Sequence, residues 1–124
     1  MTNKYDLPFE LYYQDQKVGE LLTFSYETPW STGELVFYDL QILDQLIKNR
    51  IYSDYLMELE DLELTEIEDE RLASEKEKEL KLTGIADEMM KGDKWSIVNC
   101  NGKKTIIYGL NFSFLGYLDW RGGI

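Results

Sequence analysis

The sequence predicts an α+β fold, in which an antiparallel sheet from the N- and C-terminal thirds carries a central pair of helices on one face. Residues 1–38 and 93–124 contain runs in which apolar and polar side chains alternate, as they do in strands. Residues 39–92 repeat apolar side chains at helical spacing. Because no repeat or linker divides the 124 residues, we expect a single domain, residues 1–124, made of a β segment, an acidic helical segment and a second β segment.

The N-terminal segment predicts a β-hairpin and a third strand. Apolar side chains alternate along residues 9–14 and again along residues 22–26, and a short polar stretch between them turns the chain. Pro29 lacks a backbone N–H and should end regular pairing. We expect residues 31–33 to form a turn and residues 34–38 to form the third strand.

The first helix is expected to begin after Asp39, whose carboxylate can cap its N-terminus. An apolar stripe follows at helical spacing, with the polar side chains left for solvent. Residues 61–64 should break this helix. The stripe consists of Leu40, Leu43, Leu46, Ile47, Ile51, Tyr55 and Leu59.

The second helix is expected to begin at Thr65, which forms a capping box with Glu68. Its centre, residues 74–79, is almost wholly polar, so its C-terminal part should be the better anchored. Gly84 lies inside the helical pattern and permits a break there, and Gly92 is a natural stop.

The C-terminal segment predicts a second hairpin around Asn101-Gly102, a pair that favours a two-residue type I′ turn. Such a turn would pair Cys100 with Lys103. A further strand follows over residues 110–114, and Gly116 could form a bulge in it.

Negative charge is concentrated in one stretch. Between residues 54 and 79, twelve carboxylates face three basic side chains, whereas the rest of the chain is nearly neutral. Such a field repels nucleic acids and anionic membranes and attracts basic proteins. We therefore expect a basic protein partner, no nucleic acid and no membrane, while the oligomeric state is left open.

The composition excludes several kinds of chemistry. The chain has no histidine and one cysteine, which rules out Ser–His and Cys–His nucleophiles and multi-ligand zinc sites. The acidic run lacks the central glycine of a calcium-binding loop, and there is no phosphate-binding loop. We expect no metal and no cofactor.

The lone Cys100 excludes an internal disulfide and fits a reducing compartment. The first residues show no signal-peptide pattern, and no apolar run is long enough to span a bilayer. We expect a cytoplasmic protein.

The preferred hypothesis is a non-catalytic binding module, similar in kind to immunity or inhibitor proteins, that docks a basic partner through its acidic helices. Trp120, with Arg121 beside it, is a candidate exposed anchor. The alternative interpretation is that the acidic face only confers solubility. The candidate binding residues are Glu58, Glu60, Asp61, Glu66, Asp69, Glu70 and Trp120.

Two other classes stay open. A small-molecule binder or carboxylate enzyme would use an aromatic-lined cleft, with Glu10, Glu20 or Glu27 held at a raised pKa. A self-assembling protein would expose Trp120, Met89 and Met90 in one patch. Trp30, beside a proline, is expected to plug the core. The candidate cleft residues are Tyr12, Tyr26, Trp30, Trp95 and Tyr108.

The layout resembles a group of short bacterial proteins of unknown function. The resembling features are Phe9-Glu10-Leu11-Tyr12, Lys17-Val18-Gly19, Pro29-Trp30 with Gly33, a strand–Asn-Gly–strand unit and the closing Trp120-Arg121. The resemblance covers both β segments and implies an α+β fold, without implying an activity.

Overall fold

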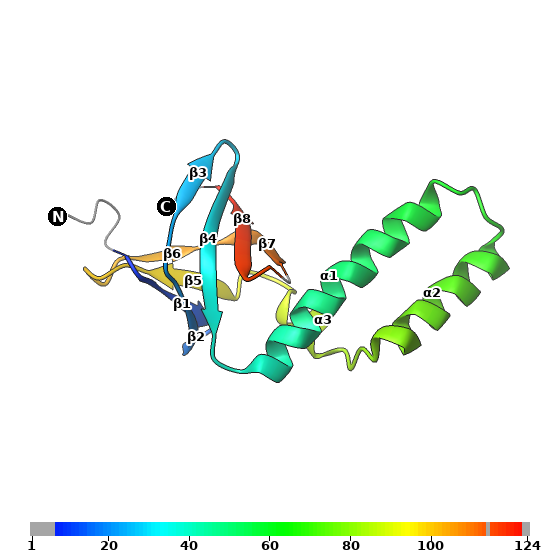
Figure 1. Ribbon diagram of the computed structural model, residues 1–124, viewed down its shortest axis with the longest axis horizontal. Helices are drawn as coiled ribbons and strands as arrows, with labels where there is room; N and C mark the ends of the chain where they lie inside the picture. The colour runs from blue at the N-terminus through cyan, green and yellow to red at the C-terminus, as the bar shows by residue number, and fades with distance from the viewer. Residues whose placement is uncertain (1–6, 114, 123–124) are drawn as a thin grey trace.

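The structure, a computed structural model, describes residues 7–113 and 115–122, and these form eight strands and three helices (Figure 1). An antiparallel sheet from the N- and C-terminal strands has helices packed against it, which confirms the predicted α+β class. The elements are β1 (Phe9–Tyr13), β2 (Gln16–Leu21), β3 (Ser25–Glu27), β4 (Trp30–Phe37), α1 (Leu40–Glu60), α2 (Glu66–Leu80), α3 (Ile85–Met89), β5 (Trp95–Val98), β6 (Lys104–Ile106), β7 (Tyr108–Phe112) and β8 (Tyr117–Arg121).

Strands β1–β8, which we call the sheet region, pair in the order β6-β5-β1-β2-β4-β8-β7, and β3 pairs with β4. The long strand β4 is shared, because residues 35–37 pair with β2 and residues 30–34 pair with β8. The inward faces of the two halves therefore contribute to one core. Its buried members are Phe9, Leu11, Leu21, Phe37, Leu46, Ala86, Met89, Trp95, Ile97, Ile107, Leu110, Phe112, Leu118 and Trp120.

The helices contribute unequally to this core. Leu46 near the start of α1 and Ala86 and Met89 of α3 are buried among the strand residues, and the indole Nε1 of Trp95 donates to the Met89 carbonyl at 2.9 Å. Helix α2 has no buried side chain anywhere along its length. Figure 1 shows α1 and α2 extending together as an antiparallel hairpin away from the sheet region.

The predicted helix starts agree with the structure. Both Gln41 N and Ile42 N donate to Asp39 Oδ1, at 3.0 and 3.1 Å, and Glu68 N donates to the Thr65 hydroxyl at 3.2 Å. The helical pattern that continues to residue 90 is divided in two, because Lys81 and Gly84 both adopt positive φ angles. The buried residues of this pattern are in α3, its C-terminal part.

The N-terminal strands differ from the prediction around two glycines. The first hairpin pairs β1 with β2 rather than with residues 22–26, and residues 31–33 lie inside β4 instead of forming a turn. A Cβ on Gly19 would lie 2.3 Å from the Val36 carbonyl oxygen, and one on Gly33 would lie 2.5 Å from the Thr23 carbonyl oxygen. These glycines therefore mark close backbone approaches within the sheet.

The predicted register of the β5–β6 hairpin is wrong by one residue. Asn99, rather than Cys100, lies opposite Lys103, because Asn99 N donates to the Lys103 carbonyl at 3.1 Å. The Asn99 side-chain oxygen also accepts from Asn101 N and Lys103 N, at 3.0 and 2.9 Å. The three-residue loop ends at Gly102 with φ +81°, the positive-φ position that such loops require.

The last hairpin joins β7 to β8. Gly116 lies in its turn, where its N–H donates to the Ser113 carbonyl at 3.1 Å, so it is not the predicted bulge. The pairing of β7 with β8 is irregular between Tyr108 and Asn111 instead. Phe114, which the sequence placed in this strand, lies outside the described residues.

Candidate protein-binding surface on the helical hairpin

The helical hairpin, residues 40–80, is held together by one half-buried stripe of α2 that lies against α1. The Lys76 ammonium lies 5.2 Å from the centre of the Tyr55 ring and pairs with Glu79 at 3.3 Å. At the root of the hairpin, Gln45 of α1 donates to the Lys81 carbonyl at 3.1 Å and accepts from the Thr83 N–H at 3.0 Å. The stripe on α2 consists of Leu72, Ala73, Lys76 and Leu80.

The far end of the hairpin, residues 58–70, contains eight carboxylates and no basic side chain; we call it the tip. It joins the last turn of α1 to the first turns of α2 through a short loop, in which Glu63 has φ +52°. All eight carboxylates are exposed, and none forms an ion pair with a described residue. They are Glu58, Glu60, Asp61, Glu63, Glu66, Glu68, Asp69 and Glu70.

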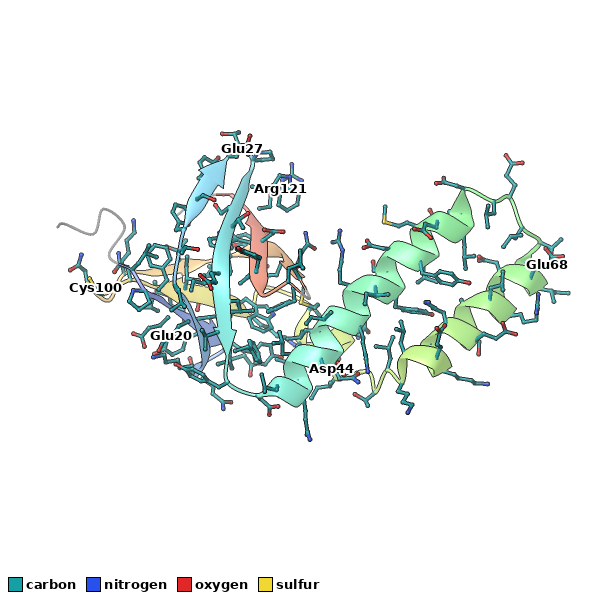
Figure 2. The ribbon with its side chains drawn as sticks, viewed as in Figure 1. Glu20, Glu27, Asp44, Glu68, Cys100 and Arg121 are labelled. Atoms are coloured by element: carbon teal, nitrogen blue, oxygen red, sulfur yellow. The ribbon has the colours of Figure 1, made fainter. Side chains whose placement is uncertain are left out.

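The six acidic residues predicted to bind a partner all lie at this tip. Glu58, Glu60 and Asp61 come from the end of α1 and its cap, whereas the other three come from the start of α2. Figure 2 shows Glu68 at the end of the hairpin, far from Glu20 and Cys100 in the sheet region. Glu63 and Glu68 share this location, although the prediction did not include them.

Carboxylates at the two helix ends have opposite effects on helix stability. Those in the first turn of α2 interact favourably with the positive end of that helix. Glu58 and Glu60 lie near the negative end of α1, whose last turn contains no basic residue, and they are therefore unfavourable there. Only the carboxylates at the end of α1 are thus maintained at a cost in helix stability.

Apolar side chains project between these carboxylates. Leu62 is 62% exposed and Ile67 is 80% exposed, and Met57 nearby is also exposed. Ile67 belongs to α2, but only the half-buried side chains further along this helix, such as Leu72 and Leu80, face α1. Exposed apolar side chains at the core of an interface, together with polar side chains at its rim, are the usual composition of a protein-binding surface, and the tip offers both kinds of side chain.

Trp120 and Trp30 differ in burial from the prediction, and each has the exposure expected of the other. Trp120 is fully buried and packs against Phe24, with 5.9 Å between ring centroids, so it cannot be the exposed anchor that the sequence suggested. Trp30, expected to plug the core, is 43% exposed. Strand alternation explains the exchange, because Ser31 pairs with Trp120 on the inner face and Trp30 pairs with Arg121 on the outer face.

Among the candidate catalytic carboxylates, Glu20 does not have the raised pKa that general-acid catalysis requires. The Tyr38 hydroxyl, which donates to Glu20 at 2.8 Å, and the Lys17 ammonium together hold the pKa of Glu20 below its usual value. Glu10 pairs with the same ammonium at 3.2 Å, and Glu27 is exposed. The surroundings of Glu20 therefore favour a permanent anion.

The structure also does not form the aromatic cleft predicted for a small-molecule binder or the exposed patch predicted for a self-assembling protein. Trp95 is buried in the core and cannot line an open aromatic cleft with Tyr26 and Tyr108, which are exposed. A hollow of about 450 Å³ at the base of the sheet region does contain aromatic side chains, but they are Tyr13, Phe37 and Tyr38, none of which belongs to the predicted set. Because Met89 and Trp120 are both buried, the exposed patch expected of a self-assembling protein does not form.

Comparison with known protein families, curated proteins and solved structures finds no match. The resemblance to short bacterial proteins therefore rests on its short motifs alone. Within the described part of the chain, no helix combines the length and apolar character needed to cross a membrane.

Proposed function

We propose that this protein is a non-catalytic binding module that docks a basic partner protein through the tip of its helical hairpin. The observation that carries the proposal is the set of eight exposed tip carboxylates without an ion-pair partner among the described residues. Elsewhere on the hairpin, every acidic side chain except Glu77 has such a partner; for example, Arg50 pairs with Asp54 at 3.1 Å and Arg71 pairs with Glu75 at 3.5 Å. The tip is therefore the part of the hairpin whose charge is left for another molecule.

The sign of the charge selects the class of partner. Nucleic acids and anionic membranes carry the same sign and would be repelled. A basic protein would be attracted over a distance, and the association rate would rise more than the affinity. An inhibitor of the immunity type, which neutralises a basic enzyme by occupying its anion-binding surface, is the concrete form of this proposal.

The exposed side chains of Leu62 and Ile67 add apolar contacts, which the carboxylates cannot provide. Apolar anchors near the centre of an interface account for much of the binding energy and slow dissociation. The expected partner surface therefore has an apolar depression ringed by lysine and arginine side chains.

The test compares capture by three forms of the tagged protein from native lysate. One form has the wild-type sequence, one carries Glu58→Lys, Asp61→Lys and Glu66→Lys, and one carries the same reversal at three exposed acids outside the tip. A stoichiometric basic protein should bind the first and third forms and be lost from the second, and its capture should weaken as salt rises. The control substitutions are Asp15→Lys, Glu27→Lys and Glu34→Lys.

Equal loss from both reversed forms would show that only net charge matters and would overturn the assignment to the tip. With the captured protein purified, Leu62→Ser and Ile67→Ser should increase its dissociation rate while leaving the association rate nearly unchanged. An unchanged dissociation rate would remove the apolar anchors from the proposal.

A further inference from the structure

A hollow of about 400 Å³ lies at the root of the hairpin, where α1, α2 and α3 meet. Its volume falls within the range of roughly 300–1,000 Å³ that is usual for small-molecule sites. Asn49, Tyr52 and Leu56 of α1 line one side at helical spacing, and Leu82, between α2 and α3, lies on another. The hollow is separate from the tip, which is at the opposite end of α2.

The charged side chains that line this hollow are all acidic. Glu77 enters from α2 and Asp87 from α3, and no lysine or arginine is among the lining residues. Glu77 has no ion-pair partner in the described chain, and Asp87 has only the exposed ammonium of Lys91, at 3.7 Å. The two carboxylates are therefore available to a cation that enters from solution.

One wall of the hollow is preformed. The Gln45 side chain lines it, and its amide donates to the Lys81 carbonyl and accepts from the N–H and the hydroxyl of Thr83. Burial and the nearby Glu77 carboxylate both raise the pKa of Tyr52, so that its hydroxyl stays neutral. A ligand would consequently meet a fixed wall and a neutral hydroxyl, with little ordering left to be done on binding.

We propose that this hollow binds a linear aliphatic diamine, whose ammonium groups pair with Glu77 and Asp87 while its methylene chain packs against Leu56 and Leu82. The apolar side chains favour an organic cation over a hydrated inorganic one. Among the described residues, no group of three or more acidic or cysteine side chains is placed to hold a metal ion. The proposal is independent of the docking function assigned to the tip.

The test titrates the protein, residues 1–124, at about 0.15 M salt, where nonspecific attraction between exposed charges is screened. Putrescine, butylamine and butanediol serve as matched probes with two, one and no ammonium groups. Isothermal titration calorimetry should show saturable one-to-one binding for putrescine, at least about tenfold weaker binding for butylamine, and none for butanediol. Backbone amide shifts in NMR spectra should move around Tyr52, Leu82 and Asp87.

Matched charge-removing variants separate this site from general attraction to an acidic protein. Glu77→Gln and Asp87→Asn should each weaken putrescine binding about tenfold or more, because each removes a charge-assisted contact. Glu70→Gln removes the same charge from the tip and should leave binding unchanged. Ser53→Trp should block the hollow, since Ser53 also lines it.

Equal weakening by Glu70→Gln and Glu77→Gln would show diffuse association and overturn the proposal. Equal binding of butylamine and putrescine would also overturn it, because a single ammonium, such as a partner's lysine side chain supplies, would then suffice. All four substituted residues are exposed, and circular dichroism would verify that each variant is folded.

Discussion

Leu118 in β8 and Leu62 at the tip are chemically identical side chains in opposite surroundings. Leu118 is completely buried between strands, whereas Leu62 is mostly exposed among carboxylates. The same contrast holds for the regions around them, because the sheet region buries a continuous core and α2 buries no side chain. The residues that stabilise this protein thus lie mainly in one region, and its unpaired charges lie mainly in the other.

The largest effect is expected when the two leucines are truncated. Leu118→Ala should lower the free energy of unfolding by about 2–5 kcal/mol, because it leaves a cavity in a packed core. Leu62→Ala should change it by less than about 0.5 kcal/mol, as is usual at exposed positions. Urea denaturation followed by tryptophan fluorescence measures both changes, and similar losses of unfolding free energy would show that the two regions do not differ in this way.

A smaller effect should distinguish the two buried tryptophans, of which only Trp95 ties the sheet region to α3. Its Nε1 donates to Met89, whereas Trp120 Nε1 has no hydrogen-bond partner in the described structure. Trp95→Phe therefore loses a hydrogen bond and leaves a buried carbonyl without that partner, whereas Trp120→Phe removes an unsatisfied donor. We expect Trp95→Phe to be more destabilising by about 1–3 kcal/mol in thermal or urea unfolding. Equal losses of unfolding free energy in the two variants would show that the lost side-chain volume alone determines the destabilisation.

Within the hairpin, reversing one charge at each helix end should have opposite effects on stability. Glu60→Lys places a cation at the C-terminus of α1 and should stabilise by about 0.3–1 kcal/mol, whereas Glu66→Lys at the N-terminus of α2 should destabilise by a similar amount. Both substitutions relieve repulsion among the tip carboxylates, so their difference isolates the interaction with the helix ends. Thermal unfolding at low salt measures it. An equal change in unfolding temperature for the two variants would mean that repulsion among the carboxylates dominates.

The smallest effect concerns pH and the Glu20 carboxylate of the sheet region. Because folding lowers the pKa of Glu20 from its ordinary value of 4.5, its ionised form adds stability at neutral pH. That contribution should disappear as the pH falls from 4.5 through the lowered value. Glu20→Gln should therefore be less stable than the wild type at pH 7, and the two stabilities should converge in acid. Glu27→Gln, at an exposed position without these partners, is the control.

The helices were the most predictable part of the fold, because their signals are local. The caps at Asp39 and Thr65 depend on side chains within three residues of the helix start, and the positive φ of Gly84 is a local backbone property. The strands depend on distant partners. Gly33 looked like a turn residue, and only the approach of Thr23, ten residues away, shows why it lies inside β4.

The candidate site could be predicted from the sequence only in part. The charge of the tip could be read from composition, and chain continuity brought the two groups of carboxylates together. The exposure of Ile67 and the burial of Trp120 could not be read, because each depends on which face of a helix or strand meets the rest of the molecule. A shift of one position between Trp30 and Ser31 is enough to exchange inside and outside.

The length of α1 has a consequence for how the protein would meet a partner. From Leu46, its last residue in the main core, to Asp61 the helix rises about 22 Å. That separation exceeds two screening lengths of about 8 Å at physiological salt, so the tip and the nearly neutral sheet region act as electrically distinct ends. A molecule with such a large electric dipole experiences a torque near a basic surface. It would turn its tip toward the partner before contact, and fewer encounters would be lost to wrong orientations.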